Sequence, residues 1–154
     1  MIRPRLIPCL LIQNGGLVKT TKFDNPKYIG DPINAVKIFN EKNVDELIVF
    51  DIDATVRGIE PNLELIANLA TECRMPLCYG GGISNVEQIK KIIDLGVEKV
   101  SISSTAIENP KIITEAVHFV GSQSIVVTLD TKKINDNFFV FSYNGKNNSK
   151  INLF

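Results

Sequence analysis

The chain has no net charge, few cysteines and a single histidine, and these shortages disfavour several classes of protein. Lys and Arg balance Asp and Glu at 17 each, so nothing favours nucleic acid or an anionic membrane as a partner. Three cysteines without a CxxC spacing disfavour a disulfide framework or a zinc site. Cys9 and Cys78 fall in apolar runs, where we expect them to be buried. His118 is better explained as a packed or surface residue than as a metal ligand, so we expect neither metal nor cofactor.

Long hydrophobic segments are also missing. The apolar run at residues 6–12 is too short to cross a bilayer, and the N-terminus shows no signal-peptide pattern. A cytoplasmic protein is therefore expected. With 44% hydrophobic and 22% charged residues, the composition is typical of a soluble globular protein, and 154 residues suit one domain.

Short apolar segments alternate with amphipathic helical patterns. Strands are predicted at residues 6–12, 46–50, 76–78, 99–102 and 124–129. Helices are predicted to begin at Asp31-Pro32, at Asn62, at a capping box from Ser84 to Glu87, and at Asn109-Pro110. This alternation predicts an α/β fold with a parallel sheet, either a closed barrel or an open doubly wound sheet.

The pattern changes after Asp130. Residues 131–134 and 138–143 predict a hairpin, and residues 144–150 a polar turn segment. Five parallel strands are too few to close an eight-stranded barrel, so apolar strand faces and sheet edges would lack cover. We therefore expect residues 1–154 to form a single domain that is a fragment or completes itself by association. Whether Phe154 is a natural end or a truncation stays open.

Polar groups gather where the predicted strands end. Gly81 and Gly82 follow one strand, and Ser103 and Ser104 follow the next, which predicts two loops that bind a phosphate, although a plain tight turn would also use the glycines. Lys19 could pair with the same phosphate or be a solvated surface lysine. The carboxylates that follow strands could act as general acid or base, or cap the adjacent loop; they are Asp51, Asp53 and Asp130.

A second set of charges lies where the predicted strands begin. Arg5, Glu46 and Lys99 each precede or open a strand, so they would converge at the bottom of a barrel. The pattern alone favours a network that stabilises the fold, because that face of such barrels is usually structural.

Several short motifs together carry a specific resemblance. They are Gly-Asp-Pro at 30–32, Asp-Glu-Leu at 45–47, Gly-Gly-Gly-Ile at 80–83, Lys-Val-Ser-Ile at 99–102, Glu-Asn-Pro at 108–110 and Gly-Ser-Gln at 121–123. In this order and spacing the chain resembles the cyclase subunit of imidazole glycerol phosphate synthase. The resemblance covers essentially all 154 residues, which correspond to the first three-fifths of that subunit.

The resemblance implies a (β/α)8 TIM barrel, here a partial barrel of about four βα units plus a fifth strand and a hairpin. In that family a glutaminase partner delivers ammonia through the barrel for a lyase and cyclase step on a bis-phosphorylated substrate. Two aspartates act as acid and base; Asp130 matches one, but Leu11 stands at the other position and cannot transfer a proton. The phosphate site would use Gly82, Ser103 and Ser104, with Lys19 nearby.

The resemblance also implies a role for the charged residues at the beginnings of the predicted strands. Arg5, Glu46 and Lys99 match three of the four members of the gate through which ammonia enters. Residues 8–12 and 14–19 look more like a branch tied to surface-polysaccharide synthesis, whose members pair with a glutaminase and pass ammonia to a separate sugar amidotransferase. Three functions stay open: an ammonia-channelling subunit of this branch, a true cyclase of histidine biosynthesis, and a non-catalytic truncated partial barrel.

Overall fold

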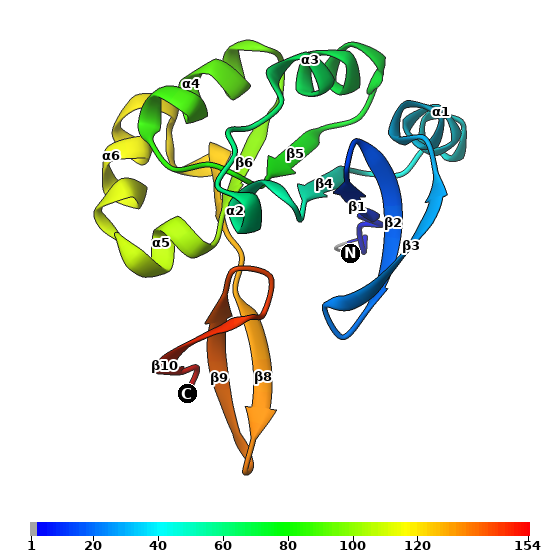
Figure 1. Cartoon of the computed structure of the whole chain (residues 1–154). Coiled ribbons are helices and arrows are strands. Elements are labelled where there is room, and N and C mark those ends of the chain that lie inside the picture. The colour runs from blue at the N-terminus through cyan, green and yellow to red at the C-terminus, as the bar shows by residue number, and fades with distance from the viewer. Residues whose placement is uncertain (1–2) are drawn as a thin grey trace.

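The computed structural model describes residues 3–154 and contains a seven-stranded sheet with helices on one side (Figure 1). Five strands run parallel, in the order in which they occur in the chain. They are β1 (Cys9–Gln13), β4 (Leu47–Asp51), β5 (Leu77–Gly80), β6 (Lys99–Ile102) and β7 (Ile125–Val127). The prediction of parallel βα units is confirmed.

The helices that connect these strands pack side by side. They are α1 (Pro32–Lys42), α3 (Leu63–Glu72), α4 (Val86–Asp94) and α6 (Lys111–Val120). Because successive side chains of a strand alternate between faces, every second strand residue meets the helices. The core between the two layers includes the fully buried Val36, Leu47, Val49, Ile66, Leu69, Ile89, Ile92 and Val100.

Local capping explains where the helices begin. The Asp31 side chain accepts from the Asn34 N–H at 2.9 Å, and Asn62 accepts from Leu65 at 3.0 Å, as predicted. The predicted capping box at Ser84 is wrong by one residue. Asn85 is the cap, because its side chain accepts from the Gln88 N–H at 2.9 Å while the Gln88 side chain accepts from the N–H of Ser84.

An antiparallel hairpin on the β1 edge was not predicted. It consists of β2 (Gly16–Thr21) and β3 (Asp24–Gly30), so the sheet order is β3-β2-β1-β4-β5-β6-β7. The signal was present in the sequence, because Asn14-Gly15 forms the two-residue turn between β1 and β2 with φ of 49° and 76°. An Asn-Gly turn of this kind is a strong hairpin signal. Short helical turns were also missed: α2 (Ala54–Arg57), α5 (Ser104–Glu108) and the 3-10 turn η1 (Ser122–Ser124).

A second, three-stranded sheet follows Asp130 and extends away from the main sheet (Figure 1). β8 (Asp130–Ile134) and β9 (Asn137–Ser142) form the predicted hairpin. β10 (Asn147–Asn152) pairs with β9, although its residues were expected in a polar turn segment. Among the helices of residues 3–154, none is long and apolar enough to cross a membrane.

The face of the main sheet opposite the helices has little cover. This open face carries Cys9, Leu11, Ile48, Phe50, Cys78, Lys99, Ser101 and Val126, and apart from Cys78 and Ser101 none of them is fully buried. Cys9 is exposed, so the expectation that both strand cysteines are buried is wrong for this one. At the β7 edge Val127 and Leu129 are 44% and 42% exposed, which leaves apolar surface available to a partner.

We predict that the 154-residue chain self-associates at micromolar concentration, most simply as a two-fold pair that buries the open faces. The Val126→Glu variant, on the open face, is expected to shift sedimentation equilibrium toward monomer because it places a charge in the contact. The Ile38→Glu variant changes a residue on helix α1 that is 54% exposed, and should leave the association unchanged. A compact wild-type monomer would contradict the prediction.

Candidate functional site

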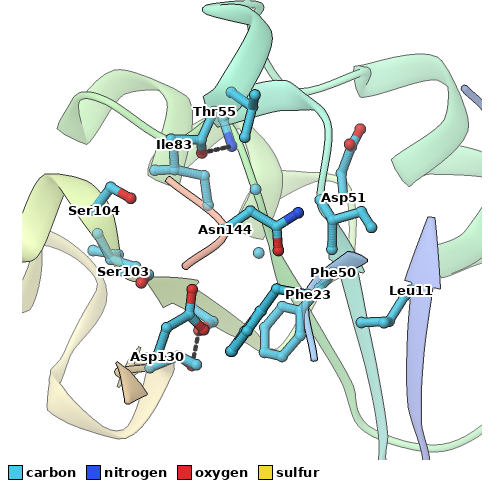
Figure 2. A pocket seen from close by; sticks show the side chains of 18 of the residues that line it. Leu11, Phe23, Phe50, Asp51, Thr55, Ile83, Ser103, Ser104, Asp130 and Asn144 are labelled. Carbon is cyan, nitrogen blue, oxygen red and sulfur yellow. Dashed lines mark hydrogen bonds between the residues drawn. The ribbon is translucent and has the colours of Figure 1, made fainter. Parts of the chain in front are cut away.

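A cavity of about 310 Å³ lies at the carboxyl ends of the parallel strands (Figure 2). In parallel α/β folds this edge of the sheet is where ligands bind. The loops after β4, β5 and β6 line it, and two hairpin ends reach it from outside, through Phe23 between β2 and β3 and Asn144 between β9 and β10. The cavity therefore combines segments that lie more than 100 residues apart in the chain.

The glycines after β5 are required by packing. A Cβ at Gly81 would lie 2.3 Å from the Asp51 carbonyl oxygen, and a Cβ at Gly82 would lie 2.8 Å from Ala54 Cβ. Both residues also have positive φ, at 124° and 71°. The Gly82 N–H donates to Thr55 Oγ1 at 3.1 Å. The tight-turn explanation therefore accounts for the glycines, and phosphate binding at Gly81 and Gly82 stays a prediction.

Ser103 and Ser104 lie across the cavity from the glycine loop, as the sequence predicted (Figure 2). Ser104 Oγ accepts from the Tyr143 N–H at 3.0 Å, which ties the β9–β10 turn to the start of α5. Thr105 Oγ1 donates to the Ile83 carbonyl at 2.5 Å, which ties the β6 loop to the β5 loop. The two predicted phosphate loops are thus joined to each other by the hydrogen bond from Thr105 to Ile83.

The three acidic residues after strands have different surroundings. Asp51 Oδ1 accepts from the N–H groups of Asp53 and Ala54 at 3.0 and 3.1 Å, so it caps the short helix α2. Asp53 accepts from the Gln13 side chain at 3.0 Å and from the Asn14 N–H at 2.8 Å, so it holds the β1–β2 turn. For these two residues the capping alternative accounts for the observed contacts.

Asp130 is the second carboxylate that lines the cavity, together with Asp51. It faces Ser103 across the lower part of the pocket (Figure 2). Burial raises the pKa of Asp130 above the ordinary value of an aspartate, while a backbone hydrogen bond from Gly145 and the charge of Lys132 act in the opposite direction. A raised pKa suits a group that transfers protons near neutral pH.

The wall opposite Asp130 is apolar. Leu11 pairs in register with Phe50 on the neighbouring strand, and both side chains line the cavity together with Phe23 (Figure 2). The Phe50 ring lies over Gly80, where a Cβ would come within 2.9 Å of it. Leu11, Phe50 and Phe23 offer no group that transfers a proton, and the other carboxylate that lines the cavity is Asp51, whose Oδ1 is engaged at the start of α2.

Lys19 does not line the cavity. It is exposed on β2 and pairs in register with Lys27 of β3. Lys22, at the end of the same hairpin, lines the cavity instead, next to Phe23. Lys22 and Phe23 have left-handed backbone conformations, with φ of 52° and 66°, which is uncommon for residues other than glycine.

At the opposite end of the strands, the predicted charged set converges. Glu46 is 5% exposed and accepts from Lys99 Nζ at 2.6 Å and from Arg5 at 3.3 Å. Nearby, burial raises the pKa of the Cys78 thiol to about 12, with the Glu46 charge adding to the effect. The geometry of a charged cluster is therefore as expected, whereas its service as an ammonia gate stays a prediction.

Comparison with known proteins places the chain in a family. The model of the histidine biosynthesis protein family matches residues 5–154. The chain belongs to this family. A Leptospira interrogans protein named "Putative imidazole glycerol phosphate synthase subunit HisF" is 56% identical over 147 residues, which are 94% of this chain and 58% of that protein. A Vibrio vulnificus protein with the same kind of name is 59% identical over 94% of this chain and 56% of its own length.

A relative whose name lacks the word "Putative" is less similar to this chain. The "Imidazole glycerol phosphate synthase subunit HisF" of Sulfurisphaera tokodaii is 42% identical over 98% of this chain and 61% of its own length. The chain thus spans about three-fifths of the length of the curated relatives that it matches. This agrees with a partial barrel of the histidine biosynthesis family.

Several residues of the site were not predicted. Thr55 and Phe23 line the cavity from elements that the periodicity did not reveal, and Asn144 lines it from the predicted polar turn segment, which had been given no part in the site. The Asn14-Gly15 turn could have located β2, the strand that precedes Phe23. No local signal points to Thr55, because α2 has only four residues. Within residues 3–154, no group of three or more His, Cys, Asp and Glu side chains is placed to hold a metal ion.

Proposed function

We propose that this chain is part of an ammonia-channelling subunit that works with a glutaminase and supplies a sugar amidotransferase in surface-polysaccharide synthesis. The observation that carries the proposal is a contrast between the two ends of the strands. At one end Arg5 and Lys99 both pair with Glu46, which gives three of the four gate residues that the resemblance implies, while at the other end Leu11 stands opposite Asp130. A conduit for ammonia needs the charged cluster, but it does not need an acid and a base facing each other in the cavity.

The charged cluster is suited to face a partner. Glu46 is buried and bonded to both cations, whereas the Arg5 side chain is 64% exposed, so the cluster is fixed from within and reachable from outside. Cys78 pairs in register with Lys99 on the open face, just inside the cluster. In this reading ammonia passes the cluster and moves along the open face toward the cavity.

The cavity supports a phosphorylated small molecule as its ligand. Hydroxyl groups of Ser103, Ser104 and Thr55 surround one half, and Lys22 contributes a positive charge at the rim. A titration with inorganic phosphate, followed by amide NMR shifts, is expected to perturb Gly82 and Ser104 selectively.

A true cyclase of histidine biosynthesis is the second candidate. Asp130 favours it, because this residue lies in the cavity with a raised pKa. The names of the relatives favour it as well. The position of Leu11 argues against it, since a leucine cannot serve as an acid or a base. A non-catalytic partial barrel stays a third candidate.

Binding of a glutaminase tests the leading proposal. We expect the glutaminase subunit of imidazole glycerol phosphate synthase to bind the 154-residue chain, and the Arg5→Glu variant to weaken this binding about tenfold or more, because it places two like charges beside each other. Titration calorimetry measures the affinity. The Asp130→Asn variant, at the far end of the strands, is the matched control and should bind as the wild type does. Equal binding of Arg5→Glu would contradict the proposed docking face.

A further inference from the structure

In the glycine loop after β5, the N–H group of Gly82 is already bonded to a side chain from another segment, that of Thr55. Gly82 lies where the proposed phosphate would bind, but its N–H donates to Thr55 Oγ1 at 3.1 Å (Figure 2). An amide proton makes one strong hydrogen bond, so this donor is already used by the protein. A phosphate at Gly82 would have to displace Thr55 or bind to something else.

The Thr55 hydroxyl is placed to be that other group. Its oxygen accepts from Gly82, which leaves the hydroxyl proton to be donated in another direction. Among residues 3–154, no protein acceptor receives that proton. Thr55 lines the main cavity and also a second cavity of about 260 Å³ beside it, so its side chain stands on the wall that the two share.

The position of Thr55 is fixed by the surrounding contacts. Asp51 caps the short helix that carries it, with bonds to the N–H groups of Asp53 and Ala54. Ala54 is fully buried and packs against the Gly82 position, where a Cβ would come within 2.8 Å. Thr55 is therefore held next to Gly82 before any ligand arrives, which lowers the cost of ordering it upon binding.

We infer that Thr55 is a ligand-binding residue of this cavity, and that its hydroxyl, oriented by the Gly82 N–H, is the donor that the glycine loop offers to a phosphate group. The inference rests on the proposed phosphate site and deepens it. The Gly82 amide polarises the hydroxyl, and a charge-assisted bond from that hydroxyl to a phosphate oxygen is stronger than a bond between neutral groups.

Three variants at one position test this. Thr55→Val keeps the shape but removes the hydroxyl and frees the Gly82 N–H, and Thr55→Ser keeps the hydroxyl. Inorganic phosphate is titrated into each 154-residue protein while amide NMR shifts are followed. We expect Thr55→Val to weaken phosphate binding about tenfold or more, as for the loss of a hydrogen bond to a charged group. Thr55→Ser should bind within about threefold of the wild type on the same basis.

The matched control is Thr71→Val, which makes the same change on helix α3, outside the cavity. The Thr71 hydroxyl donates to the Ala67 carbonyl with an oxygen–oxygen distance of 2.8 Å. It should bind phosphate as the wild type does. Equal or tighter binding by Thr55→Val would overturn the inference, because the freed Gly82 amide would then be the better donor. Weak binding by Thr55→Ser would also overturn it. If the wild type itself shows no phosphate shift, the proposed phosphate site falls together with this inference.

Discussion

Replacing Gly81 with alanine is expected to lower the free energy of unfolding by about 3 to 5 kcal/mol, the sum of backbone strain and overpacking. The new Cβ would lie 2.3 Å from the Asp51 carbonyl oxygen, and backbone atoms cannot move aside cheaply. The residue also has φ of 124°, which side chains rarely adopt. Urea denaturation followed by circular dichroism, at equal protein concentrations, measures the change.

Gly58→Ala is the matched control for strain without a clash. Gly58 has φ of 64° at the end of helix α2, but a Cβ there would meet no atom within 4 Å. Its cost should stay at about 1 to 2 kcal/mol, the usual penalty of a left-handed residue with a side chain. Equal effects of the two substitutions would show that the β4 loop does not press on Gly81 as the structure indicates.

The second large effect concerns catalysis. With Leu11 facing Asp130 across the cavity, cyclase turnover is expected to be absent, or lowered by about 10² to 10⁴-fold or more, the usual contribution of a general acid or base. The chain should therefore fail to restore growth of a histidine auxotroph that lacks the cyclase. Robust growth would favour the histidine-biosynthesis function over ammonia channelling.

The Leu11→Asp variant separates two causes of such a failure. Leu11 lies on the open face of β1, so a carboxylate at this position would point into the cavity that holds Asp130. Rescue by this variant and not by the wild type would assign the loss to this one side chain. Failure of both would assign it to parts of the barrel outside these 154 residues.

The fold class followed from local patterns in the sequence. Each buried strand is a short apolar run, and the connecting helices α1, α3 and α4 begin at a side chain that caps them, such as Asp31 and Asn62. These signals act over a few residues, so they can be recognised without knowledge of the partners in space. Strand β2 was missed although the Asn14-Gly15 turn that joins it to β1 is equally local.

The sequence alone also identified Leu11 and Asp130 as the residues at the two positions where the family resemblance implies an acid and a base. Only the tertiary structure decided which polar groups are free to use. Asp51 and Asp53 accept hydrogen bonds from loop N–H groups, Lys19 does not line the cavity, and Thr55 accepts the Gly82 N–H. The reason is physical: whether a donor or acceptor is available depends on neighbours from distant segments, and a linear pattern does not record them.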